Sequence, residues 1–195
     1  MSDDFVTIVS GLPRSGTSLM MQMLQAGGMP LLTDGQRAPD EHNPRGYFEH
    51  ESVKHSQKDL SWLQDAKEKA VKVIHLLLTS LPTDRDYRVL FMLRDLEEVI
   101  RSQRTMLQKQ GRAIANLSDE ALKSVFEKQL ATARQWLAER QNFRVLDVQY
   151  RDVIENSTAT SERVNRFLGG NLSVASMAAA VHPELYRQRK SALAK

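Results

Sequence analysis

At 195 residues, with 41% hydrophobic and 26% charged residues, the chain has the size and balance of one folded domain spanning residues 1–195. It contains no cysteine, which excludes a disulfide framework, a thiol nucleophile and cysteine-ligated metals. The net charge of +3 comes from dispersed basic residues, which fits an anionic small-molecule ligand and disfavours nucleic acid as a partner.

The beginning of the sequence does not resemble a targeting segment. Residues 1–10 carry two aspartates and then a short apolar run, without the basic start of a signal peptide. No apolar stretch approaches the roughly 18 residues that a membrane-spanning helix needs. We therefore expect a cytoplasmic protein with no membrane partner, and the sequence predicts no particular oligomeric state.

The first predicted elements are a strand, a tight loop and a helix. Residues 5–10 form a short β-branched run that ends at a glycine, as a buried parallel strand does. Residues 15–26 have apolar side chains at helical spacing, and two glycines follow them. Residues 28–46 are rich in Gly, Pro, Asp and Asn, which predicts a long functional loop.

The rest of the chain continues as alternating strands and helices. Ser118 stands where a helix N-cap is expected, before the longest amphipathic pattern. This alternation predicts an α/β fold, a parallel sheet with helices on both faces. The further predicted strands are residues 71–77, 88–93 and 143–148, and the further predicted helices are residues 96–110, 118–140 and 159–168.

The loop between the first strand and the first helix has the pattern of a phosphate-binding loop. Residues 11–18 read G-L-P-R-S-G-T-S, which matches G-x-x-x-x-G-K-[ST] at both glycines and at Ser18. Thr17 stands at the position of the lysine, and the cation lies inside the loop as Arg14. Glycines let the backbone approach an anion, and the helix N-terminus supplies N–H donors. The loop therefore predicts a site for a phosphate-like anion.

A second anion site is predicted at the end of the strand at residues 88–93. Arg94 directly follows that strand, and Ser102 lies eight residues later within the next predicted helix. Ligands of open α/β sheets bind beyond the carboxyl ends of the strands. Asp95 leaves a kinase open as an alternative, because a kinase needs a carboxylate to bind Mg²⁺. A kinase of this type also needs the loop lysine, which is Thr17 here.

These two motifs together resemble those of the sulfotransferases. P-R-S-G-T-S after an apolar strand is similar to the 5′-phosphosulfate loop of that family, and the run from Arg94 to Ser102 resembles its second signature. The resemblance implies a P-loop NTPase-like sulfotransferase fold and 3′-phosphoadenosine 5′-phosphosulfate (PAPS) as co-substrate, with no metal. The 5′-phosphosulfate would be bound by Pro13, Arg14, Ser15, Gly16, Thr17 and Ser18, and the 3′-phosphate by Arg94 and Ser102.

The resemblance also implies which residues act in catalysis. Arg14 would stabilise the charge that develops on the departing 5′-phosphate. Residues 43–50, N-P-R-G-Y-F-E-H, resemble an element of bacterial sulfotransferase-like proteins, and Glu49 is the first candidate for the general base. His50 is the second candidate and His42 the third.

Two further matches to the family lie later in the chain. Tyr150 and Asp152 are expected to buttress the site. Arg187, Arg189 and Lys190 resemble a late element that contacts the 3′-phosphate, although Ser191 replaces its glycine.

The predicted function is transfer of a sulfuryl group from PAPS to a hydroxyl or amine of a small-molecule or sugar acceptor. The acceptor itself is not predicted. Two alternatives stay open: a P-loop nucleotide or small-molecule kinase, and a noncatalytic nucleotide-binding protein of the same fold.

Overall fold

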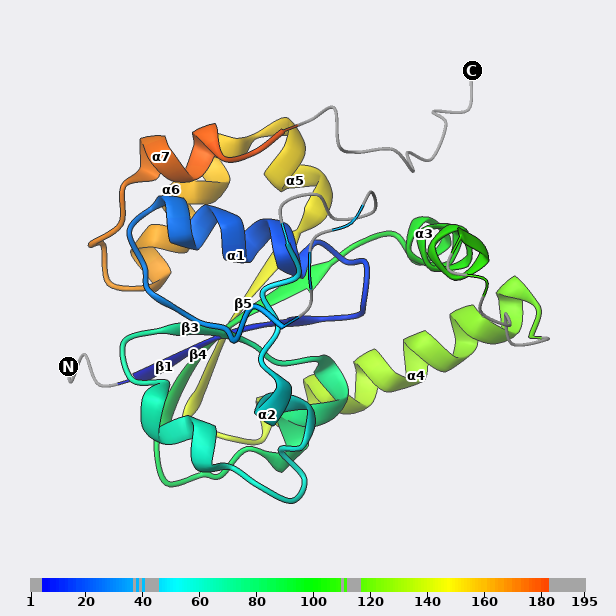
Figure 1. The fold of residues 1–195 in the computed structure, drawn as a ribbon, viewed down its shortest axis with the longest axis horizontal. Helices are drawn as coiled ribbons and strands as arrows, with labels where there is room; N and C mark the ends of the chain where they lie inside the picture. The colour runs from blue at the N-terminus through cyan, green and yellow to red at the C-terminus, as the bar shows by residue number, and fades with distance from the viewer. Residues whose placement is uncertain are drawn as a thin grey trace.

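The computed structural model describes residues 5–36, 38, 40, 46–109, 111 and 117–182. Its centre is a five-stranded sheet in the order β2-β3-β1-β4-β5, in which every neighbouring pair is parallel (Figure 1). This confirms the predicted α/β class. The strands are β1 (Phe5–Gly11), β2 (Leu31–Leu32), β3 (Ala70–Lys72), β4 (Asp86–Leu93) and β5 (Phe143–Gln149).

Helices connect the strands and cover both faces of the sheet. Two of the connections also contain 3-10 segments, η1 (Ser61–Asp65) and η2 (His75–Ser80). In the described part of the chain no helix is both long and apolar enough to cross a membrane. The α-helices are α1 (Thr17–Ala26), α2 (Glu51–Lys54), α3 (Leu96–Lys109), α4 (Asp119–Ala138), α5 (Tyr150–Glu155), α6 (Ser157–Phe167) and α7 (Val174–Ala179).

The hydrophobic core has two layers, one on each side of the sheet. Adjacent residues of a strand point to opposite faces, so Ile8 belongs to one layer and Val9 to the other. One layer packs against α1, α5, α6 and α7, and the other against α4, η1 and η2 (Figure 1). Because both faces are covered, the central strands are almost wholly apolar, which is why they were recognisable in the sequence.

Each predicted helix and strand has a counterpart in the structure, and the largest difference in extent is at β3. The strand predicted at residues 71–77 ends at Lys72, and η2 begins at His75. Here the chain turns because the His75 ring is buried and donates from Nδ1 to the carbonyl oxygen of Gly11, at 3.2 Å. The short helices α2, α5 and α7 were not predicted, and the loop predicted at residues 28–46 contains the two-residue strand β2.

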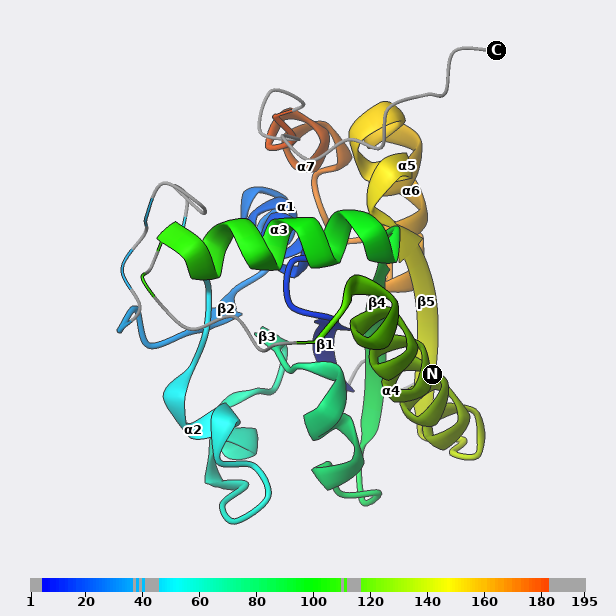
Figure 2. The ribbon, with the colours of Figure 1, turned by 90° about the vertical axis from the view of Figure 1, so that its right-hand side faces the viewer.

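The parallel arrangement brings the carboxyl ends of β1, β3, β4 and β5 to one edge of the sheet. Helix α1 begins at this edge, and α3 runs across it (Figure 2). Segments that are far apart in the sequence therefore meet there, as the rule for ligand sites in α/β sheets requires.

Candidate functional site

A cavity of about 480 Å³ opens at this edge of the sheet. Its volume lies within the usual range for small-molecule and cofactor sites. The structure brings both predicted anion sites into it, together with Glu49. Every residue predicted to bind the donor lines the cavity except Ser15: Pro13, Arg14, Gly16, Thr17, Ser18, Arg94 and Ser102.

The phosphate loop, residues 11–18, depends on its two glycines. Gly11 and Gly16 have φ angles of +143° and +104°, a region that disfavours side chains. A Cβ atom on Gly11 would lie 2.6 Å from the carbonyl oxygen of Met92, and one on Gly16 would lie 2.4 Å from the ring of Tyr150. The loop is therefore pressed against β4 and the start of α5, and only glycine fits at either position.

Arg14 links the two predicted anion sites. Its Nε donates to Ser102 Oγ at 2.9 Å, and its carbonyl oxygen accepts from Arg94 Nη1 at 3.1 Å. Arg14 has φ +73°, an uncommon conformation for a residue with a side chain and one often found at functional sites. Burial lowers the pKa of Arg14; Tyr47 opposes this effect and the charge of Arg94 adds to it. A bound anion would relieve this unfavourable burial of charge.

Arg94 lines the cavity and is held in place by contacts with Glu98 and Tyr150. Its Nε donates to Glu98 Oε2 at 2.9 Å, and both side chains of this ion pair are less than 10% exposed. The guanidinium group also lies over the ring of Tyr150, with Cζ 4.5 Å from the ring centroid. Tyr150 thus supports both Gly16 and Arg94, in line with the buttressing role expected for it.

Lys72 is a cation of the site that the sequence reasoning missed. From the end of β3 its Nζ donates to Ser18 Oγ at 3.1 Å and to the carbonyl oxygen of Tyr47 at 2.9 Å. The same Nζ lies 3.8 Å from Glu49 Oε1, and the lysine side chain is only 10% exposed. A signal was present in the sequence, because Lys72 interrupts an apolar run between Val71 and Val73 at a strand end.

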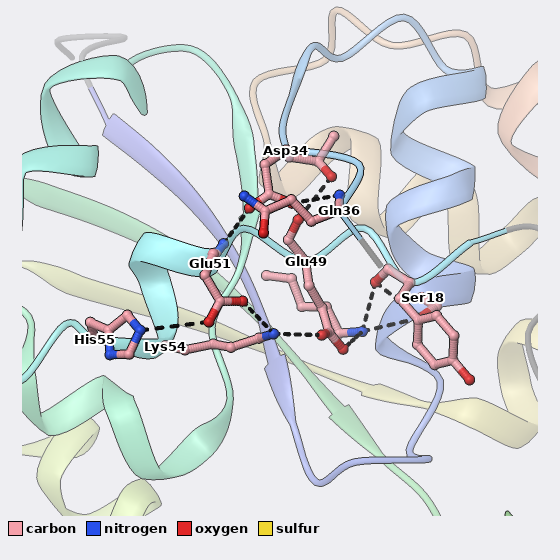
Figure 3. Close-up of polar contacts among 10 residues, drawn as sticks. Ser18, Asp34, Gln36, Glu49, Glu51, Lys54 and His55 are labelled. Carbon is pink, nitrogen blue, oxygen red and sulfur yellow. Dashed lines mark hydrogen bonds and ion pairs between the residues drawn. The ribbon is translucent and has the colours of Figure 1, made fainter. Parts of the chain in front are cut away.

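Glu49 projects into the cavity between two lysines. Lys72 approaches one carboxylate oxygen. Lys54 Nζ lies 3.5 Å from the other (Figure 3). His50, the second candidate base, does not line the cavity, and its buried Nδ1 has no hydrogen-bond partner among the described residues. His42, the third candidate, lies outside the described residues.

Two buried polar side chains support the loop from behind. His75 donates to Gly11 as described above, and its Nε2 lies 3.0 Å from Gln129 Oε1 on α4. Ser15 is 1% exposed, and within the described part of the chain its Oγ has no hydrogen-bond partner. Neither residue lines the cavity, so we assign them to the framework of the loop.

The remaining predicted residues are placed as follows. Asp95 Oδ1 accepts from the N–H groups of Glu97 and Glu98 in the first turn of α3, and Asp95 does not line the cavity. Asp152 does not line the cavity either.

The late basic residues Arg187, Arg189 and Lys190 lie outside the described residues. Among those that are described, no three His, Asp or Glu side chains are grouped as a metal site requires.

Apolar side chains also line the cavity, among them Leu19, Ile74 and Met106. A mainly apolar lining with a few polar groups is usual in sites for small molecules. The cavity can therefore receive an apolar part of a small molecule as well as an anion.

Comparison with known proteins identifies a family. The family model described as "Sulfotransferase domain" matches residues 4–191 of the chain. A search of curated protein sequences finds no match.

Solved structures support the same fold. The sulfotransferase domain of the olefin synthase from Synechococcus PCC 7002 is 15% identical, with a TM-score of 0.54, and the match covers 97% of this chain and 89% of that one. The sulfotransferase domain of the curacin biosynthetic pathway is 18% identical, with a TM-score of 0.53 and coverages of 95% and 78%. Mouse sulfotransferase SULT7A1, solved in complex with PAP, is 17% identical, with a TM-score of 0.58 and coverages of 100% and 69%.

Proposed function

The chain belongs to the sulfotransferase domain family, and on that basis we propose that it transfers a sulfuryl group from PAPS to a hydroxyl or amine of a small-molecule acceptor. One observation carries the proposal: Arg14, Lys72 and Arg94, from three different strand ends, all line the cavity that the phosphate loop encloses. Such a concentration of positive charge suits a donor with anionic groups at both its 5′ and 3′ positions.

The phosphate loop is the proposed site of the 5′-phosphosulfate. Transfer breaks the bond between sulfur and the bridging oxygen, and negative charge grows on that oxygen and on the departing phosphate. Arg14, the Ser18 hydroxyl and the N–H groups at the start of α1 are the donors that stabilise this charge. Lys72, which donates to Ser18, adds a second cation at the same end of the cavity.

Arg94 and Ser102 form the proposed site of the 3′-phosphate. Arg94 is fixed by Glu98 and Tyr150, so its orientation does not have to be established when the donor binds. In the structure Ser102 Oγ accepts from Arg14, and its hydroxyl hydrogen can donate to a phosphate oxygen at the same time.

Glu49 is the proposed general base. The acceptor oxygen forms a bond to sulfur while its proton passes to the Glu49 carboxylate, so charge does not accumulate on the acceptor. The neighbouring Lys72 joins this side of the cavity to the phosphate loop, through contacts with Glu49 and Ser18. His50 is not proposed for this role, because it does not line the cavity.

The kinase alternative is not proposed, because Asp95, its candidate metal ligand, does not line the cavity and accepts from two main-chain N–H groups at the start of α3. The noncatalytic alternative is tested by transfer itself. Radiolabelled PAPS should label at least one member of a panel of phenols, alkanols, sugars and amines, and Glu49→Gln should lower turnover by about 10²–10⁴-fold while donor binding persists. Binding of adenosine 3′,5′-bisphosphate without transfer to any acceptor would favour the noncatalytic protein. Full activity of the Glu49→Gln variant would exclude Glu49 as the base.

A further inference from the structure

The segment that carries Glu49 is held in place by residues that follow β2. Thr33 Oγ1 and the N–H of Asp34 both donate to the carbonyl oxygen of Glu49, at 2.9 and 3.3 Å. The carboxylate of Asp34 accepts in turn from the N–H of Glu51 and, at 3.0 Å, from the N–H of Gln36 (Figure 3). Asp34 therefore binds the main chain on both sides of His50, from the carbonyl of Glu49 to the amide of Glu51.

The main chain of this segment adopts an unfavourable conformation that must be fixed from outside. Phe48, directly before Glu49, has φ +53°, where a bulky residue is rarely found. Such residues persist only where the surrounding structure determines them, and they cluster at functional sites. The Phe48 side chain packs against the core layer under α1, which holds one end of the segment. The hydrogen bonds of Asp34 and Thr33 hold the other end.

Asp34 also supplies what the start of α2 lacks. The N-cap residue of this short helix, His50, makes no side-chain capping bond, and the carboxylate of Asp34 accepts from the first helical N–H instead. One turn further on, Lys54 Nζ lies 2.8 Å from Glu51 Oε2 and 3.5 Å from Glu49 Oε2. The position of the start of α2 therefore also determines where the Lys54 ammonium group contacts the Glu49 carboxylate.

We propose that Asp34 is a positioning residue for the reaction: it fixes the main chain of Glu49 and Glu51 so that the Glu49 carboxylate faces the cavity between Lys72 and Lys54. Asp34 itself does not line the cavity. The inference rests on the proposed function in one respect, the role of Glu49 as base. Removal of the Asp34 carboxylate takes away the acceptor of the Glu51 N–H and so loosens the segment, while the bonds to the Glu49 carbonyl and the residues that hold the donor are not touched.

The test compares Asp34→Asn with a matched control, Asp59→Asn. Asp59 also accepts from a main-chain N–H two residues later, that of Ser61, but it does not line the cavity or contact Glu49. Turnover is followed with radiolabelled PAPS and 4-nitrophenol as the probe acceptor. Hydrogen exchange of the amides of residues 49–54, with adenosine 3′,5′-bisphosphate present, gives a second measurement that needs no acceptor.

Asp34→Asn is expected to lower kcat by about ten- to a hundredfold, the size of effect that a small misplacement of a catalytic group produces, with the KM for PAPS unchanged. Exchange at residues 49–54 should accelerate in this variant and not in Asp59→Asn. In a Glu49→Gln background, Asp34→Asn should cause no further loss, because it acts through Glu49. If Asp34→Asn does not fold, Thr33→Val removes one donor to the same carbonyl and should give the same pattern with a smaller loss.

The inference is overturned if Asp34→Asn turns over and exchanges like Asp59→Asn, or if its full loss also appears in the Glu49→Gln background. Failure of the proposed function has a different signature, in which the wild-type protein neither transfers sulfate nor is stabilised by adenosine 3′,5′-bisphosphate. In that case the exchange measurement still reports whether Asp34 fixes the segment of Glu49.

Discussion

At the scale of single residues, the site depends on side chains that each contact two different segments of the chain. Arg14 carries charge into the cavity and also joins Ser102 to the phosphate loop. Lys72 contacts Ser18 and the Tyr47 carbonyl while it lies close to Glu49. Sequence reasoning found Arg14, because the residues that define its role are its neighbours in the chain. It missed Lys72, because the partners of Lys72 come from two other segments.

Replacement of Lys72 by methionine keeps the aliphatic side chain and removes the charge. We expect the kcat of sulfuryl transfer to fall by about 10²-fold, the typical cost of losing one donor that stabilises developing charge. The binding of adenosine 3′,5′-bisphosphate should weaken as well, which isothermal titration would measure. Lys58→Met is the matched control, since Lys58 is exposed and outside the cavity. Equal kcat values for the two variants would show that Lys72 takes no part in the reaction.

Asp34 gives a prediction about stability and pH. Burial alone would raise its pKa, but the N–H groups of Gln36 and Glu51 and the nearby His50 and Lys54 outweigh this, and the pKa of Asp34 lies below its ordinary value. A lowered pKa in the folded state stabilises the protein above the unfolded-state pKa of about 3.9, and that contribution is lost as the pH falls through the folded-state value.

The two carboxylate oxygens of Asp34 accept from different main-chain N–H groups, those of Gln36 and Glu51. Asp34→Asn keeps one acceptor oxygen and no charge, so it should destabilise the protein by about 1 kcal/mol at pH 7. The difference from wild type should shrink as the pH falls through the folded-state pKa of Asp34, where the wild-type carboxylate becomes protonated as well. Urea unfolding of both proteins at pH 7 and at a series of lower pH values measures it. A difference that does not change with pH would show that the ionised carboxylate is not what stabilises the segment.

At the scale of elements, the unit of β1, phosphate loop and α1 was predictable, because the apolar strand, the glycines and the helix periodicity all lie within one short stretch. The end of β3 was not. Its chain turns because His75 bonds to Gly11 and lies against Gln129, residues remote from it in the sequence. Local patterns therefore located the phosphate loop, but they did not show what supports it.

Gly16→Ala tests how tightly the phosphate loop is packed. The new Cβ would meet the Tyr150 ring in addition to adopting a φ of +104°, so we expect a loss of about 2–4 kcal/mol from strain and overpacking. Gly28→Ala separates the two causes, because Gly28 has φ +98° and a methyl group there would have nothing within 4 Å. It should cost only about 1 kcal/mol. Equal losses in thermal unfolding would mean that the contact with Tyr150 is not tight.

At the scale of the whole molecule, the parallel sheet assembles the site. Its topology places Arg14, Lys72 and Arg94 at the ends of three adjacent strands, although they are far apart in the sequence. The family model matches residues 4–191, and the solved structures share the fold. The predicted sulfotransferase family and fold class are thus confirmed, while the roles of the individual residues are proposals that stand on the geometry of the cavity.

The central claim is that the cavity binds PAPS through both of its phosphate ends, and the most direct measurement is ligand-induced thermal stabilisation without added metal. Adenosine 3′,5′-bisphosphate at about one hundred times its dissociation constant should raise the Tm by about 5–10 °C. Adenosine 5′-monophosphate, which lacks the 3′-phosphate, should raise it much less at the same concentration, and Arg94→Met should abolish the difference between the two nucleotides. Two results would contradict the account. One is equal stabilisation of the wild-type protein by the two nucleotides, and the other is stabilisation by ATP with Mg²⁺ but not by adenosine 3′,5′-bisphosphate.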